Sequence, residues 1–92
     1  MKAEDRTRIL RAIAKARCWA GELTSGTIAG TEAIARRENL TERSVRMTLS
    51  LVFLAPSIVQ AIVDGRLPRG LGVRNLVVLP ASWAEQERAL GM

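Results

Sequence analysis

The sequence predicts an all-α protein, a compact bundle of five to six helices with a central helix-turn-helix. Apolar residues recur at helical spacing, capping residues stand before several of these segments, and glycines and prolines separate them into short pieces. A chain of 92 residues can build one hydrophobic core, so we treat residues 1–92 as a single domain.

The first helix is expected over residues 4–20, with Gly21 as the first break. Ile9, Ile13 and Ala16 fall on one face of this segment. Four basic side chains lie largely outside that face: Arg6, Arg8, Arg11 and Lys15. Such a row of cations either follows a phosphate backbone or is simply solvated, and the sequence leaves both readings open.

Two short helices are expected in the middle of the chain. Thr31 is suited to cap a helix that ends near Glu38, and Thr41 is suited to cap the next one, with Glu42 in its first turn. Residues 45–53 also alternate as a strand would. The cap, the length of the run and the lack of a nearby partner strand favour a helix.

The rest of the chain predicts three more helices. Residues 49–55 contain one polar residue and are expected to be buried on nearly all sides. Pro56 suits the first turn of the next helix, and Ser82 with Glu85 forms a capping box. The expected ranges are 57–64, closed by Gly65, then 73–79 and 83–90.

Residues 31–54 have the spacing of a helix-turn-helix motif. Ala35 is small enough for two helices to cross closely, and Asn39 tolerates the positive φ that the turn requires. Leu40 is expected to fill the angle between the helices, and Val45 to anchor the second helix on the first. The residues left outward on the second helix are Thr41, Glu42, Arg43, Arg46, Met47 and Ser50.

In such a motif the N-terminal part of the second helix enters the major groove of DNA. Arg43 and Arg46 match guanine O6 and N7, and Glu42 matches a cytosine amino group. Thr41 and Ser44 suit phosphate oxygens. The alternative is an ordinary helical hairpin whose outward residues are only solvated.

The residues resemble a known family at this point. The chain is similar to a bacterial helix-turn-helix family of phage and mobile-element proteins, which includes the C-terminal regions of some serine recombinases. The resemblance covers most of residues 9–91 and rests on residues 16–19, 34–45, 49–51, 54–56, 58–59, 61–62, 64–66, 68–71, 80, 83 and 85–86. The central part also resembles, more loosely, the helix-turn-helix domain of ParB-type partition proteins.

The resemblance implies a DNA-binding face on the second helix of the motif. Carried over by position, this face comprises Thr41, Glu42, Arg43, Ser44, Arg46 and Met47, with Arg36 and Arg37 on the preceding helix. Asn39 stands where the family usually has glycine, and Thr48 stands where it usually has a large aliphatic residue. The second departure predicts weaker packing, or packing shifted onto Leu49.

Composition favours binding over catalysis. The net charge of +5 and a pI near 11.0 are typical of proteins that bind polyanions. Without histidine, and with Cys18 as the single cysteine, the chain offers no usual general base, activated thiol or metal site. We therefore expect no enzyme activity, cofactor, metal or membrane span, and a cytoplasmic location.

Several residues carry expectations of their own. Trp19 and Trp83 are expected to anchor the core or an interface, and Cys18 to be a buried, inert thiol. Three further arginines are expected to cluster at a second turn-rich segment, where they bind phosphates or are solvated: Arg66, Arg69 and Arg74.

The expected partner is double-stranded DNA, bound by a homodimer. The dimer follows from the habits of the motif and from a surplus of apolar residues, namely Leu51, Phe53, Val63, Val77 and Val78. The expected role is regulation or DNA handling in a phage or mobile element. The main rival is a small protein-interaction module, such as a phage inhibitor or an anti-CRISPR protein; a third reading is an accessory domain of a site-specific recombinase.

Overall fold

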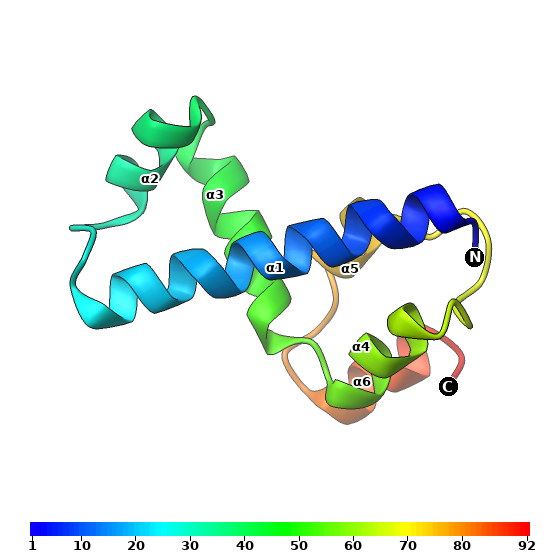
Figure 1. The fold of residues 1–92 in the computed structure, drawn as a ribbon. Coiled ribbons are helices and arrows are strands. Elements are labelled where there is room, and N and C mark those ends of the chain that lie inside the picture. Colours follow the sequence, from blue (N-terminus) through cyan, green and yellow to red (C-terminus); the bar gives the residue numbers. More distant parts are fainter.

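The computed structural model describes all of residues 1–92 and contains only helices (Figure 1). The elements in chain order are α1 (Ala3–Ser25), α2 (Thr31–Glu38), α3 (Glu42–Leu49), the 3₁₀-helix η1 (Ser50–Phe53), α4 (Pro56–Val63), α5 (Val73–Leu76) and α6 (Trp83–Ala89). The predicted all-α bundle is confirmed. Residues 45–53 form helix rather than strand, as the capping residue indicated.

The α1 helix runs the whole length of the molecule. At 1.5 Å per residue its 23 residues span about 35 Å, close to the longest dimension of 37 Å. The predicted end at Gly21 is wrong, because the helix continues to Ser25 and ends at Gly26 with φ +77°. A glycine inside a helix costs about 1 kcal/mol, and the last turn of α1 offsets this cost through packing by Leu23 and an ion pair from Glu22.

Two clusters of buried residues lie along α1. The larger joins the first half of α1 to η1 and α4, and its members include Ile9, Ile13, Leu51, Ile58 and Ile62. The smaller lies under α2 and α3 and consists of Trp19, Ile34, Ala35 and Val45. Figure 1 shows the resulting shape: α3 crosses α1, with α2 on one side of the crossing and α4 and α6 on the other.

The chain turns sharply between η1 and α4. The segment Glu42–Phe53 and α4 are bent by 98° at this break. Ala55 precedes a proline and takes an extended ψ of 140°, and Pro56 starts α4 as predicted. The expected full burial of residues 49–55 is partly wrong: Leu51, Leu54 and Ala55 are buried, but the Phe53 side chain is 66% exposed.

The last two helices are shorter than predicted. The α5 helix ends at Leu76 rather than Leu79. Pro80 accounts for the last of these residues, because a proline disfavours helical backbone at the residue before it. At the start of α6 the Ser82 hydroxyl accepts a hydrogen bond from the Glu85 N–H, which is one half of the predicted capping box. The α4 helix ends one residue early, at Val63, and is followed by Gly65 with φ +68°.

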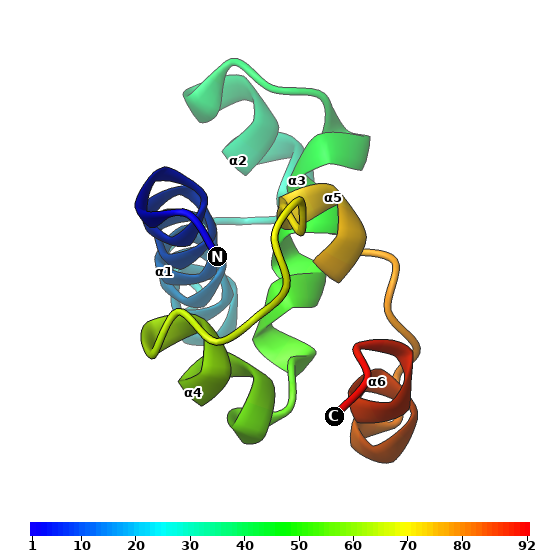
Figure 2. The same cartoon turned by 90° about the vertical axis from the view of Figure 1, so that its right-hand side faces the viewer.

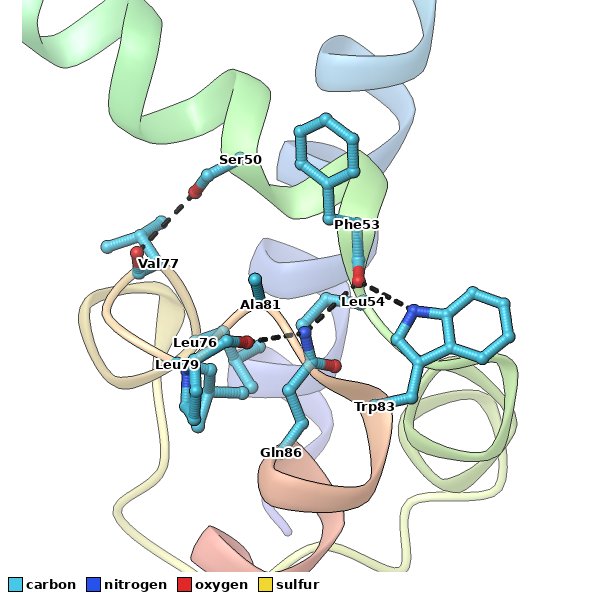
Figure 3. A pocket seen from close by; sticks show the side chains of 10 residues that line it. Ser50, Phe53, Leu54, Leu76, Val77, Leu79, Ala81, Trp83 and Gln86 are labelled. Carbon is cyan, nitrogen blue, oxygen red and sulfur yellow. Dashed lines mark hydrogen bonds between the residues drawn. The ribbon is translucent and has the colours of Figure 1, made fainter.

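The buried amide of Gln86 fastens α6 to the break before α4 (Figure 3). Its Nε2 donates to the Phe53 carbonyl at 3.1 Å and to the Pro80 carbonyl at 2.9 Å. Its Oε1 accepts the Ala55 N–H at 2.8 Å. The indole N–H of Trp83 donates to the same Phe53 carbonyl at 3.1 Å. This side chain is 55% exposed, so of its two expected roles the core one is excluded and the interface one stays a prediction.

No helix by itself has the length and apolar character needed to cross a membrane. Only Glu42–Phe53 counted together with Pro56–Val63 reaches that level, by length and composition, and these two segments are sharply bent.

We predict that Gln86→Leu lowers the free energy of unfolding by about 1–3 kcal/mol, because it leaves the buried Ala55 N–H without an acceptor. Urea denaturation measures this change. The matched control is Gln60→Leu, which alters an exposed glutamine on α4 and should stay within about 0.5 kcal/mol of the wild type. Equal stability of the two variants would contradict the role assigned to Gln86.

Candidate nucleic-acid interface

The turn between α2 and α3 depends on the left-handed conformation of Asn39. This residue has φ +57° and ψ +46° and is the one non-glycine residue with positive φ. The Leu40 N–H donates to the Ala35 carbonyl at 2.9 Å, and the Asn39 N–H donates to the Arg36 carbonyl at 3.4 Å. These two bonds form a Schellman motif, which ends α2 and leaves a turn of three residues.

The start of α3 is fixed by two polar contacts. The Thr41 hydroxyl accepts the Ser44 N–H at 3.1 Å, so Thr41 is the predicted N-cap. The predicted cap of α2 is wrong: Gly30 holds that position, and the Thr31 hydroxyl donates to Glu42 Oε1 at 2.9 Å. Glu42 therefore links the first turns of α2 and α3.

The packing beneath the motif agrees with the prediction at Ala35 and Val45 but not at Leu40. Ile34 and Val45 are fully buried, and Ala35 is 7% exposed where α2 meets its neighbours. The prediction for Leu40 is wrong, because this side chain is 41% exposed. The large side chain of Trp19, from α1, packs with Ile34, Ala35 and Val45, so α1 rather than the turn fills the angle between α2 and α3.

The predicted recognition face divides into two parts. Thr41, Arg43, Ser44 and Met47 line one hollow of about 360 Å³. Glu42 lies on the other side of α3, in a hollow that it shares with Arg36 and the start of α2.

The two arginines of α3 differ in what they contact. Arg43 is exposed and forms no ion pair, so its guanidinium is free to bind a ligand. Arg46 Nη1 lies 3.0 Å from Glu42 Oε1, one helical turn back. Ser50, expected to point outward, is half-buried and donates to the Met47 carbonyl.

Arg37 belongs to a different part of the molecule. Its Nη2 donates to Glu22 Oε1 at 2.9 Å and its Nε to Glu38 Oε2 at 3.0 Å, which ties α2 to the end of α1. Hydrogen bonds from the Arg37 side chain lower the pKa of Glu22, and the two carboxylates raise the pKa of Arg37. We call these contacts the Arg37 clip; they occupy the guanidinium, and the assignment of Arg37 to the binding face stays a prediction.

The structure also places residues beside α3 that the list of candidate site residues lacked. Val73 and Arg74 from α5, with Val77 directly after it, line the same hollow as Arg43 and Met47. Arg66, which was grouped with Arg74 in the sequence, pairs with Asp64 at 3.3 Å and does not line this hollow. No local sequence signal could have found this neighbour of α3, because the contact joins segments about 30 residues apart.

The expected burial of the Cys18 thiol is wrong. Its side chain is exposed on α1, and its Sγ lies 3.9 Å from Glu22 Oε1.

The fold and this site define a small all-α protein in which α2 and α3 form a helix-turn-helix. Neither protein-family models, nor curated proteins, nor solved structures give a match to the chain.

We predict that Asn39→Val lowers the free energy of unfolding by about 1–2 kcal/mol, because a β-branched residue is strained at positive φ. Asn39→Gly is the matched comparison and should stay within about 1 kcal/mol of the wild type. Thermal or urea unfolding compares the two. If valine were tolerated as well as glycine, the turn would not depend on the left-handed conformation.

A second prediction concerns the clip between α1 and α2. Arg37→Gln should raise the pKa of Glu22 toward its ordinary value, since the largest cause of the lowered pKa is removed. A carboxyl with a lowered folded-state pKa contributes stability above its unfolded pKa and loses it as pH falls, so Arg37→Gln should weaken that acid-side loss. NMR titration of the Glu22 carboxyl measures the shift. Arg36→Gln is the control, and an identical Glu22 titration in both variants would rule out the clip.

Proposed function

We propose that the protein binds duplex DNA and reads base edges in the major groove with the N-terminal half of α3. The observation that carries this proposal is Arg43, an exposed and unpaired guanidinium on the first turn of a helix whose entry is fixed by the Asn39 turn and the Thr41 cap. A guanidinium held in this way suits the bidentate contact to guanine O6 and N7.

Neighbouring residues supply the contacts that orient such a helix. Thr41 and Ser44 border the hollow beside Arg43, where their hydroxyls suit phosphate oxygens. Met47 lies on the same side and suits the thymine methyl group, which accepts apolar contacts. Glu42 is left out of base reading in this proposal, because Thr31 and Arg46 already bind its carboxylate.

The proposed binding unit is a homodimer, which would present two α3 helices to one duplex. Three of the apolar residues expected at its interface are exposed: Phe53, Val63 and Val78. Leu51 is buried in the larger cluster and takes no part in such a contact. A role in regulation or DNA handling within a phage or mobile element rests on the resemblance described above.

A protein partner is the second candidate, and specific observations favour it. The Glu42–Arg46 ion pair occupies one of the two arginines of α3, and Met47 on this helix and Leu40 in the turn before it add apolar surface. This pattern suits a protein-binding surface of an inhibitor or a recombinase accessory domain better than it suits a purely phosphate-binding one.

The test is binding to a DNA sequence selected from a random pool. We expect affinity to fall by about 10³-fold or more between 50 and 200 mM salt if six or more phosphates are contacted. Arg43→Ala should weaken binding to the selected site by about 1–3 kcal/mol without changing the helical content. Arg88→Ala, an exposed arginine on α6, is the control. Binding that is insensitive both to salt and to Arg43→Ala would favour the protein-partner function.

A further inference from the structure

The surface where α1, α3 and α5 meet is hollowed and continuous. Three adjoining hollows lie along it, and Val73 at the start of α5 lines all three. In Figure 2, α1 lies on one side of α3 and α5 lies in front of it. We call the surface formed by these three hollows, between α1, α3 and α5, the notch.

The notch carries most of the excess positive charge of the protein. Its five basic side chains come from three helices: Arg8, Arg11, Lys15, Arg43 and Arg74. Asp5 is the one carboxylate that lines it, which leaves a net charge of +4 out of +5 for the whole chain. On the opposite side, around α2, the arginines Arg36, Arg37 and Arg46 are outnumbered by Glu22, Glu32, Glu38 and Glu42.

The cations of the notch are available to a ligand. Arg11, Lys15 and Arg74 are exposed and form no ion pair, as is also true of Arg43. Arg8 lies 3.6 Å from Asp5, but its side chain remains 73% exposed. Several arginines elsewhere are committed to internal contacts, for example Arg6, whose Nε donates to the Val63 carbonyl at 2.8 Å.

The spacing of the α1 cations matches a nucleic-acid backbone. Arg8, Arg11 and Lys15 occupy positions i, i+3 and i+7, so they share one face of the helix. The seven residues from Arg8 to Lys15 rise about 10 Å, and phosphates on one DNA strand advance about 3.4 Å each along the axis. A row that lies parallel to the duplex axis therefore spans about three phosphate steps of one strand, enough for each of its three cations to reach a phosphate. The Lys15 Nζ lies 6.0 Å from the centroid of the Trp19 ring, at the outer limit of a cation–π contact.

We propose that the notch is a phosphate-binding surface, which holds one strand of duplex DNA through Arg11, Lys15 and Arg74 while α3 enters the adjacent groove. This inference rests on the proposed function, since it extends the same DNA contact from α3 onto α1 and α5. Arg43 belongs to both surfaces, because it lines the hollow that α3 shares with α5. The notch contacts supply affinity and orientation, and the sequence preference stays with α3.

The experiment measures the salt dependence of binding to a mixed-sequence duplex by the full chain and by two triple variants. Arg11→Gln/Lys15→Gln/Arg74→Gln removes three phosphate contacts and should lower the log–log salt slope by about 2.7, from about 0.9 per phosphate. The matched control is Lys2→Gln/Arg17→Gln/Arg88→Gln, which removes the same charge from exposed residues outside the notch. The control should keep the wild-type slope.

The outcomes separate the two proposals. A loss of slope in the notch variant alone supports the phosphate surface. Equal slopes in the notch variant and the wild type would overturn it and leave the reading role of α3 in place. Equal losses in both triple variants would also overturn it, because only the net charge would matter. If the wild type binds no duplex, both proposals fail, and an acidic protein segment becomes the occupant to test.

Discussion

The packing of Trp19 against Ile34, Ala35 and Val45 is the contact on which the rest of the site depends. These four buried residues come from α1, α2 and α3, and they form the whole buried core beneath the turn. The direction of α3 is thus set by its packing on Trp19 of α1 rather than by Leu40 in the turn itself. Because the same helix continues into the larger cluster, the two clusters are held in one fixed relation.

Much of the fold could be predicted because its elements are signalled locally. The left-handed Asn39, the Thr41 cap, Pro56 at the start of α4 and Ser82 before α6 each act within three or four residues along the chain. Errors arose where a distant contact overrides a local preference. Gly21 was expected to end the first helix, but tertiary packing of the following turn outweighs its modest helix penalty.

The site was harder to predict because a sequence shows which side chains are charged but not which of them form ion pairs in the folded protein. Arg37 and Arg46 were both assigned to the recognition face, yet the fold gives each a carboxylate partner and leaves Arg43 free. Arg74 and the α1 cations lie far from α3 in the sequence. Arg74 comes beside α3 only after the chain bends by 98° before α4 and returns to α5, and the α1 cations come beside it where α1 and α3 cross. Helical periodicity showed that the α1 cations lie on one side of the helix. It did not show that α3 and α5 border that side.

The length of α1 has a mechanical consequence. Because the α1 helix contributes residues to both buried clusters, the molecule has no hinge between the pair α2 and α3 and the part formed by the larger cluster. A ligand that touches both must accept the angle between them as it stands, and little ordering entropy is lost when it does. For a duplex, that angle would act as a template: stretches of DNA that curve easily would fit at lower elastic cost than stiff ones, so preference could arise at base pairs that no side chain reaches.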